Sequence, residues 1–449
     1  KPQLLGMILL LLILLAVIFI ILSTTRLHLH PFLALIIATF AFGLLAGIPI
    51  RELLTTINQG FGGTIGNIGL IIIFGLIIGA FLEKSGGAYS LAQQVLQWVG
   101  TKSIHAAMGI IGYIVSIPVF ADSGFIILAS LNKALSNKAQ VSVAGTAIAL
   151  SMGLMVTHTM VPPTPGPIAA ASILGADLGR VILIGLFASM GALVVAVLFA
   201  KKYAASFQLN EVQQSTTHIE AAPSYSPSAG KAFLPIIIPI LLIILKSIAE
   251  FPTKPLGESA FIEFLLFMGN PVVALFLGML LAFLLPRKFS RSMLGTSGWV
   301  GEALQQAAMI ILITGAGGAF GKVLQSSGVG EVLEDMVGGA RIGIWLPFLV
   351  AAALKTAQGS STVALITTAS IMAPLLPSLG LDGEMTKALA VVAIGAGSAV
   401  ASHANDSFFW VVTQMTGMSV RQGYLLQSLG SGITGLSAMI LLFLLSLFL

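Results

Sequence analysis

The chain has 449 residues, of which 57% are hydrophobic and only 8% are charged, and its mean hydropathy is +1.03. A soluble domain carries about 25% charged residues, so this composition excludes an ordinary soluble protein and predicts an all-α polytopic membrane protein. No cysteine is present, which excludes disulfides, and a net charge of +5 is typical of basic cytoplasmic loops rather than of a nucleic-acid-binding protein.

Five apolar runs in the first half of the chain predict membrane-spanning helices. The first run is about 19 residues long and no small-residue cleavage site follows it, so we interpret it as a retained helix and not as a signal peptide. The fourth run contains a proline-rich break. The five runs are Leu4–Leu22, Pro31–Ile48, Thr64–Leu82, Val141–Ile173 and Val181–Ala200.

Two shorter apolar segments lie between the third and fourth runs. Ser103–Ile117 and Gly124–Leu135 are separated by the polar tip Pro118–Ser123. Each segment is too short to cross a hydrocarbon core of about 30 Å. The pattern therefore predicts a re-entrant hairpin whose tip lies inside the membrane.

Residues 201–230 are rich in polar residues and predict a solvated linker, after which the plan repeats. Gly75 and Gly79 match Gly317 and Gly321 at an offset of about 240 residues. The small-xxx-small spacing also favours close helix packing. The apolar runs of the second half are Phe233–Ala249, Phe261–Leu285, Ala303–Leu324, the short pair Ile342–Leu354 and Val363–Leu376, the interrupted run Ala388–Val412, and Leu429–Leu449.

The order of elements predicts two repeats, residues 1–200 and 231–449, with about five spanning helices and one hairpin each. An odd number of crossings places the second repeat in the opposite orientation to the first. Most Lys and Arg residues of the loops fall on the face that holds the linker, which predicts a cytoplasmic linker at 201–230 and both termini on the outer side.

Four polar interruptions are expected at membrane depth: Asp122-Ser123, Thr157–Pro167, Gln358–Thr362 and Ser402–Ser407. Four prolines in the second of these prevent a continuous helix, because each removes a backbone donor. Inverted repeats bring such breaks together near the midplane, where half-helix N-termini attract an anionic group. The arrangement is typical of a transporter and not of an enzyme.

Ionisable side chains at these breaks are candidates for coupling and binding. Asp122 and Asp406 are expected to carry protons, because burying an unpaired carboxylate is costly; the alternative is that each caps a broken helix. His158 and His403 match across the repeats and are expected to line the site, with proton carriage as a second role. Lys355 is expected to meet a substrate carboxylate, the alternatives being a pair with an aspartate or an interfacial position.

Hydroxyl and amide groups at the same breaks suit a polyhydroxylated ligand, although each has the alternative role of bonding broken backbone. No nucleophile–base pair, nucleotide loop or metal motif accompanies them, so no cofactor, metal or enzymatic chemistry is expected. These further candidates for substrate binding are Ser123, Thr159, Thr164, Ser360, Ser361, Thr362, Asn405 and Ser407.

Several segments together resemble the gluconate permease family. They are His30–Leu35, Phe120–Phe125, Val161–Pro167, Leu174–Asp177, Gly315–Phe320, Gln358–Ala364 and Ser402–Trp410. The resemblance implies a proton symporter for gluconate or a related sugar acid in a bacterial inner membrane, which would place the termini in the periplasm. It also implies a homodimer in the bilayer and an elevator mechanism, with residues 1–82 and 231–325 as scaffold and residues 103–200 and 341–449 as the transport part.

One departure from the family leaves the substrate open. Family members commonly carry glutamate and an apolar residue where this chain has Asp122 and Ser123. Because the family includes carriers of other sugar acids and of D-serine, these remain alternatives. Sodium coupling is a further alternative, and an intramembrane enzyme or channel is the alternative from a different class.

Overall fold

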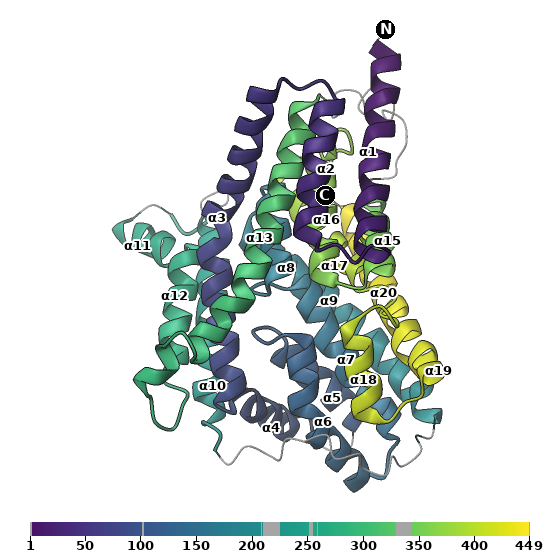
Figure 1. Ribbon diagram of the computed structural model, residues 1–449. Helices are drawn as coiled ribbons and strands as arrows, with labels where there is room; N and C mark the ends of the chain where they lie inside the picture. Colours follow the sequence, from purple (N-terminus) through teal and green to yellow (C-terminus); the bar gives the residue numbers. More distant parts are fainter. Residues whose placement is uncertain are drawn as a thin grey trace.

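Helices make up all regular secondary structure in residues 2–100, 103–207, 209, 225–250, 255–257, 259–328 and 343–448, the parts of the chain that the computed structural model describes (Figure 1). Within them, six helical stretches are long and apolar enough to cross a membrane, or seven if a bent pair counts as one span. The predicted all-α membrane protein is confirmed. Most of the predicted linker, residues 208 and 210–224, lies outside the described residues.

The elements of the first half run from α1 to α9, and those of the second half from α10 to α20. The first half contains α1 (Pro2–Thr25), α2 (Pro31–Leu45), α3 (Ile50–Lys84), α4 (Gly87–Val99), α5 (Ile104–Val115), α6 (Ala121–Lys138), α7 (Val143–Met160), α8 (Pro165–Leu174), α9 (Leu178–Lys202) and the short turn η1 (Ala204–Ser206). The second half contains α10 (Ala229–Ala249), α11 (Ala260–Met268), α12 (Pro271–Ala282), η2 (Arg291–Leu294), α13 (Trp299–Ser326), α15 (Trp345–Gln358), α16 (Ser361–Met372), η3 (Ala373–Leu375), α17 (Glu384–Ser398), α18 (Ser407–Thr416), α19 (Val420–Gly423), the π-helical turn η4 (Tyr424–Ser428) and α20 (Leu429–Ser446).

Both proline- and polar-rich breaks fall where the sequence predicts them. The fourth run divides into α7 and α8, and the interrupted run of the second half divides into α17 and α18. Both short helix pairs also form, as α5 with α6 and α15 with α16. In these four elements, the structure therefore agrees with the sequence on where the helices are interrupted.

Three elements differ from the sequence prediction. Helix α3 begins at Ile50, well before the predicted Thr64, and the amphipathic helix α4 has no predicted counterpart. The predicted span Phe261–Leu285 is two helices bent by 68°. Its bend follows from Asn270, which caps α12 by accepting a hydrogen bond from the Val272 N–H, with a proline at the first helical position.

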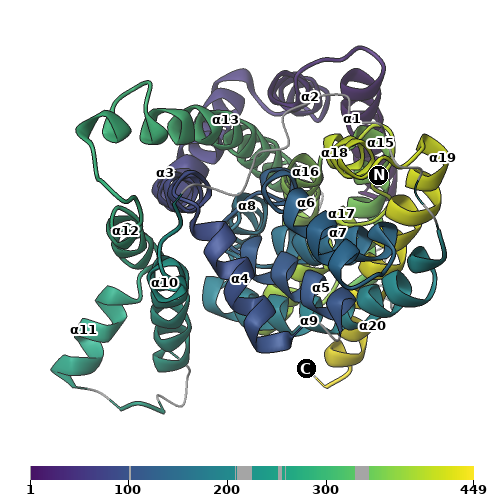
Figure 2. The ribbon, with the colours of Figure 1, turned by 90° about the horizontal axis from the view of Figure 1, so that it is seen from below.

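Helices α3 and α13 pack side by side along much of their length (Figures 1 and 2). Their backbones approach closely because glycines face each other: a Cβ on Gly60 would lie 2.6 Å from the Gly318 carbonyl oxygen. An ion pair between Lys84 and Glu302 joins the two helices near the end of α3. The two helices therefore form one packed unit beside the helices that hold the four interruptions.

Of the two matching glycine pairs, the pair on α3 faces the breaks of the first half and the pair on α13 faces helix α16. Cβ atoms at Gly75 and Gly79 would lie 3.2 Å from the Pro163 carbonyl oxygen and 2.3 Å from that of Pro118. On α13, a Cβ at Gly317 would lie 2.6 Å from the Ser370 Oγ, and one at Gly321 would lie 3.0 Å from the Ser370 carbonyl oxygen. The close packing predicted from the small-xxx-small spacing is confirmed.

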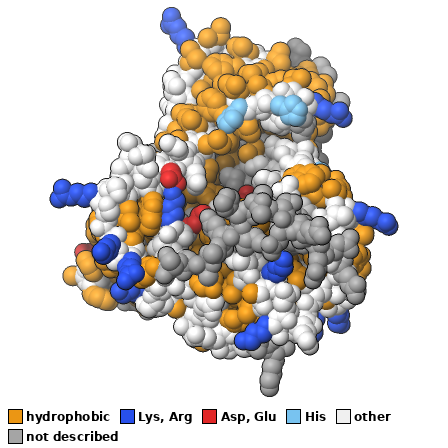
Figure 3. Space-filling view, turned by 60° about the horizontal axis from the view of Figure 1, so that its bottom comes forward, with side chains coloured by type: hydrophobic (Ala, Val, Ile, Leu, Met, Phe, Trp, Pro, Cys, Tyr) orange, Lys and Arg blue, Asp and Glu red, His pale blue; other side chains and the backbone are white. Residues whose placement is uncertain are grey.

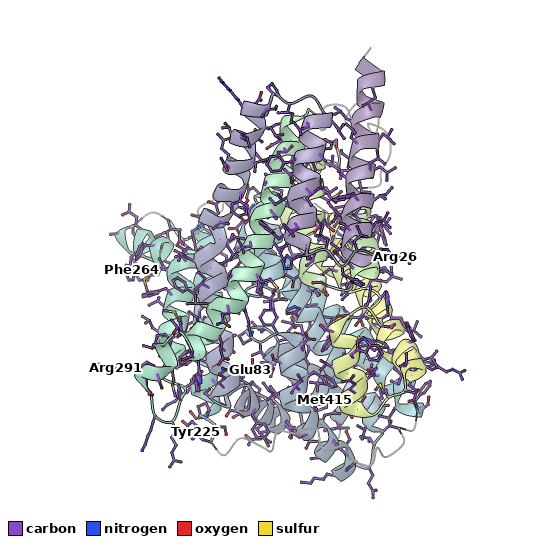
Figure 4. All side chains as sticks on the ribbon, viewed as in Figure 1. Arg26, Glu83, Tyr225, Phe264, Arg291 and Met415 are labelled. Carbon is purple, nitrogen blue, oxygen red and sulfur yellow. The ribbon has the colours of Figure 1, made fainter. Side chains whose placement is uncertain are left out.

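The surface carries large hydrophobic areas, as expected for a protein whose solvent is partly lipid (Figure 3). Helix α11 has no buried residue, and its three phenylalanines are 58–71% exposed. Phe264 on this helix lies at the outer edge of the molecule (Figure 4). Such side chains are stable in contact with acyl chains, which supports a position of α11 at the lipid boundary.

Candidate functional site

A cavity of about 350 Å³ lies where the interrupted elements meet. Its lining consists of residues 120–122 at the start of α6, Met155 and His158 near the end of α7, residues 358–362 at the turn between α15 and α16, and residues 405–408 at the start of α18. Helices α6 and α18 are in contact (Figure 2). All four predicted interruptions or their immediate neighbours therefore contribute to one cavity.

Three helix N-termini meet at this cavity, those of α6, α16 and α18. The first N–H groups of a helix have no partner within the helix and carry partial positive charge. Ser360 caps α16, with its Oγ accepting from the Val363 N–H at 3.3 Å, while Ser361 and Thr362 form the first turn at the cavity. The N-termini of three helices thus border the cavity, as at other anion sites, although the Phe408 N–H of α18 already donates to Asp406.

Asp406 is held by a complete set of donors. The Lys355 Nζ lies 2.7 Å from its Oδ2, the Ser402 Oγ donates to the same oxygen at 2.5 Å, and the Phe408 N–H donates to Oδ1 at 3.1 Å. The Asp406 side chain is only 9% exposed and that of Lys355 only 1%. The ammonium group of Lys355 also donates to the Gly359 carbonyl oxygen. This network gives each carboxylate oxygen of Asp406 at least one donor.

Asp122 has a much weaker set of partners. The Ser407 Oγ donates to its Oδ2 at 3.2 Å, and its Oδ1 is buried with no hydrogen-bond partner among the described residues. The charged or titratable groups that face it are His158 on α7, Asp406 at the start of α18 and Lys355 at the end of α15. Protonation of Asp122 would remove a poorly compensated charge from a largely buried position.

Two further side chains of the cavity have unmet hydrogen-bonding capacity. The His158 Nδ1 and both amide atoms of Gln358 are buried and, within the described parts of the chain, have no partner. Phe120 packs against the His158 ring with centroids 5.4 Å apart and so holds it in place. Buried polar groups are normally paired with protein, water or ligand, so these atoms indicate a site for a polar molecule.

The break before α18 is supported by α20 and the turn that precedes it. The Ser402 N–H donates to the Ser431 Oγ at 2.9 Å, and the Ser402 carbonyl accepts from the Ser428 Oγ at 2.5 Å. The Ala404 carbonyl accepts from the Trp410 Nε1 at 2.8 Å. The unwound backbone therefore has partners although it lies inside the protein, which is the condition for such a break at membrane depth.

The turn between α15 and α16 fits tightly against this break. Gly359 adopts φ +84°, and a Cβ there would lie 2.1 Å from the Asn405 carbonyl oxygen. The Asn405 Nδ2 donates to the Thr356 carbonyl at 2.8 Å, and the His403 Nε2 lies 2.9 Å from the same oxygen. These contacts cap the end of α15 and fix the position of Lys355 relative to Asp406.

Several predicted site residues form hydrogen bonds with the backbone and do not line the cavity. The Thr159 Oγ1 donates to the Met155 carbonyl at 3.0 Å and the Thr164 Oγ1 to the Val161 carbonyl at 2.7 Å, and both residues are buried. Neither they nor Ser123 and His403 line the cavity. The structure thus shows the alternative, local role for the two threonines, and places His403 behind the site.

Lys355 also takes the role that the sequence left as an alternative, since it pairs with an aspartate. Asp406 caps α18, which is the structural role given above as the alternative to proton transfer for both aspartates. The remaining predicted residues line the cavity, and they are Asp122, His158, Ser360, Ser361, Thr362, Asn405 and Ser407.

Sequence reasoning did not name six of the lining residues as binding candidates: Phe120, Ala121, Met155, Gln358, Gly359 and Phe408. Met155 lies three residues before His158, so helical spacing places both on one face of α7. Phe120 and Phe408 lie one or two residues from predicted polar residues. Gln358 precedes the glycine in the left-handed conformation, and its unpaired amide is visible only once the turn is built.

The sequence profile of the GntP family permeases matches residues 8–448. The chain belongs to this family. A gluconate permease of Pseudomonas aeruginosa is 36% identical over 415 residues, 90% of each chain. The D-serine transporter DsdX of Escherichia coli is 32% identical over 433 residues, 95% of this chain and 96% of its own. The chain is therefore a multi-pass inner-membrane transporter of small molecules and not an enzyme.

The fold is similar to that of a solved structure with little sequence similarity. The YdaH transporter of Alcanivorax borkumensis superposes with a TM-score of 0.66 at 13% identity, over 94% of this chain and 99% of its own. At this identity the likeness concerns the fold alone.

Proposed function

We propose that this permease takes up gluconate or a related small hydroxy acid, driven by the proton gradient. The names of the relatives support gluconate. The observation that carries the proposal is the meeting of three helix N-termini with the weakly held carboxyl of Asp122 in one cavity. Such a cavity offers donors to a carboxylate and, beside them, a group that is able to take up the coupled proton.

In this proposal the substrate carboxylate lies at the N-terminus of α16, beside Ser361 and Thr362. Gln358, His158 and Asn405 line the same space and provide amide and imidazole groups for the substrate hydroxyls. Because Lys355 already neutralises Asp406, the helix N-termini and not a free lysine are the main attraction for the anion.

Asp122 is the proposed proton carrier, with Asp406 as an anchor that Lys355 holds in place. Binding a proton at Asp122 removes its repulsion with an incoming carboxylate, so proton and substrate favour each other's binding. That reciprocity is what a symporter needs. The pairing of Asp406 with three donors argues against the same role there.

D-serine is the second candidate substrate, since one relative is named as its transporter. Its ammonium group would bind best to an ionised Asp122, whereas gluconate would bind best when Asp122 is protonated. The two substrates therefore predict opposite dependence on the state of this residue.

We also propose an elevator motion of a transport part against a scaffold, in a homodimer whose chain has two inverted repeats, periplasmic termini and a cytoplasmic linker at 201–230. Residues 1–82 and 231–325 would form the scaffold, and residues 103–200 and 341–449 the moving part. The glycine faces of α3 and α13, which contact Pro118, Pro163 and Ser370 of the other part, support this division. A cysteine pair across the α3–Pro118 contact, in a chain that has no native cysteine, should block uptake until it is reduced.

Uptake into proteoliposomes tests the proposed function. Gluconate should accumulate under an inward proton gradient without sodium, and a protonophore should abolish the accumulation. If uptake requires sodium, the transporter is coupled to sodium and not to protons. If D-serine accumulates and gluconate does not, D-serine is the substrate. If gluconate only equilibrates across the membrane and no ion gradient drives its accumulation, the protein is a channel.

A further inference from the structure

A second cavity, of about 630 Å³, lies among the beginning of α5, the end of α6 and the end of α9. It is separate from the first, because the first lies at the N-terminus of α6 and the second at its C-terminus. Helix α6 has 18 residues, so the two ends are about 27 Å apart at a rise of about 1.5 Å per residue. The transport proposal above does not use this cavity.

Basic side chains line the second cavity. Lys138 comes from α6 and Lys201 from α9, and the described part of the lining also includes His105 of α5 but no acidic residue. Lys201 lies close enough to His105 to act on it electrostatically, and the His105 Nε2 is buried without a hydrogen-bond partner in the described part of the structure. Neither lysine is in an ion pair among the described residues. Among the described residues, the cavity therefore holds positive charge without an acidic counterpart.

The rest of the lining is mostly apolar and continues toward the outer surface of α9. Leu135, Val141 and Val197 line the cavity, and so does Leu198, whose side chain is 48% exposed. Val194, one turn before Leu198 on the same face of α9, is 57% exposed. A molecule with an anionic head and an apolar body matches both halves of this surface.

The position of the cavity agrees with a site at the membrane interface. The helix ends around it lie at the end of the molecule that comes forward in Figure 3, where more Lys and Arg than acidic side chains are visible. The charge distribution of the sequence predicts that this end is cytoplasmic. Anionic lipids give that leaflet its negative surface potential, and basic pockets between helices on that side bind their head groups.

We propose that this cavity binds the phosphodiester head group of an anionic phospholipid, with an acyl chain along Val194 and Leu198. Lys138 and Lys201 hold the phosphate from two different helices. Bound lipid thereby ties the end of α6 to the end of α9 and stabilises their packing. The apolar wall reaches the lipid-facing surface and would contact an acyl chain. Free phosphate has no apolar part to contact this wall, so the cavity favours a lipid.

Lipid retention by the purified full-length protein tests the site. The protein is delipidated, titrated with phosphatidylglycerol or phosphatidylcholine, and bound lipids are counted by native mass spectrometry. The double variant Lys138→Gln/Lys201→Gln is compared with Lys133→Gln/Lys202→Gln, which removes the same charge from exposed positions that do not line the cavity. Ala106→Phe fills the cavity without changing any charge.

The first double variant should lose at least about tenfold in phosphatidylglycerol affinity, because it removes both lysines that would contact the phosphate. Ala106→Phe should lose it as well, whereas the control should retain it. Equal loss in the control would reduce the effect to general surface charge and overturn the site. So would equal retention of phosphatidylcholine, or displacement of the lipid by millimolar inorganic phosphate, which would indicate a free-phosphate site.

Thermal unfolding separates a failed variant from a failed proposal. Phosphatidylglycerol should raise the unfolding midpoint of the wild type and the control but not that of Ala106→Phe. If Ala106→Phe unfolds before any lipid is added, the comparison rests on the lysine variants. A wild type that neither retains phosphatidylglycerol nor is stabilised by it contradicts the proposal.

Discussion

Two carboxylates that line the same cavity, Asp406 and Asp122, have opposite surroundings. Asp406 receives three donors, one of them an ammonium group that is almost fully buried. Asp122 receives one hydroxyl at 3.2 Å and keeps one oxygen unpaired among the described residues. Burial alone therefore does not indicate function. In the proposed function, the donors around each group make Asp406 an anchor and leave Asp122 as the group that changes its protonation.

Removing the lysine of the anchor should have the largest effect. Lys355→Met leaves Asp406 buried without its cation, and breaking one side of a buried pair costs about 3–5 kcal/mol. We expect a lower unfolding midpoint and little protein in the membrane. The double variant Lys355→Met/Asp406→Asn removes both charges and should recover most of the lost stability. If the single variant is as stable as the wild type, Asp406 is not anchored by this pair.

Neutralising the second carboxylate should affect coupling and not stability. Asp122→Asn loses a single weak hydrogen bond, so its unfolding midpoint should stay near that of the wild type. Uptake driven by the proton gradient should fall to the level of empty liposomes, whereas exchange of labelled for unlabelled gluconate should continue. Asp406→Asn is the matched comparison, and it should lower both activities and stability. Normal proton-driven uptake by Asp122→Asn would remove Asp122 from the mechanism.

A substitution in the turn between α15 and α16 should have an intermediate effect on uptake. Gly359→Ala places a methyl group 2.1 Å from the Asn405 carbonyl in a left-handed conformation, and such strain costs about 1–3 kcal/mol. The turn must shift relative to Asn405, so the gluconate concentration for half-maximal uptake should rise. Gly62→Ala on α3 has open space around it and serves as a control. An unchanged half-maximal concentration would show that the turn tolerates the shift.

The smallest effects are expected for threonine-to-valine substitutions, and they should differ between a threonine that lines the cavity and one that does not. Thr362→Val removes a hydroxyl of the cavity and should weaken gluconate binding by about two- to tenfold, the range of one hydrogen bond. Thr159→Val removes a hydroxyl that bonds only to its own helix, and uptake should remain at the wild-type level. Measured half-maximal concentrations that are equal in the two variants would contradict the placement of the substrate beside α16.

The sequence predicts the interruptions well, because clustered prolines and polar residues inside an apolar run are incompatible with a continuous lipid-facing helix. It also brings Asp122, Asp406 and Lys355 forward as candidates. It does not decide between their alternatives, because the ion pair joins residues 51 positions apart and forms only when the turn at Gly359 packs on Asn405. The unpaired amide of Gln358 and the bend between α11 and α12 likewise depend on local geometry that composition and hydropathy do not encode.

The glycine faces of α3 and α13 have a consequence for the rate of any movement between the two parts. Side chains that interlock must leave one set of holes before they enter the next, which creates barriers along the path. At Gly75, Gly79, Gly317 and Gly321 the helices contribute no side chain, and the atoms opposite are mainly carbonyl oxygens and Ser370, with the Ile366 side chain against Gly317. We therefore expect the contact at these glycines to add little to the barrier for movement between the proposed scaffold and the proposed transport part.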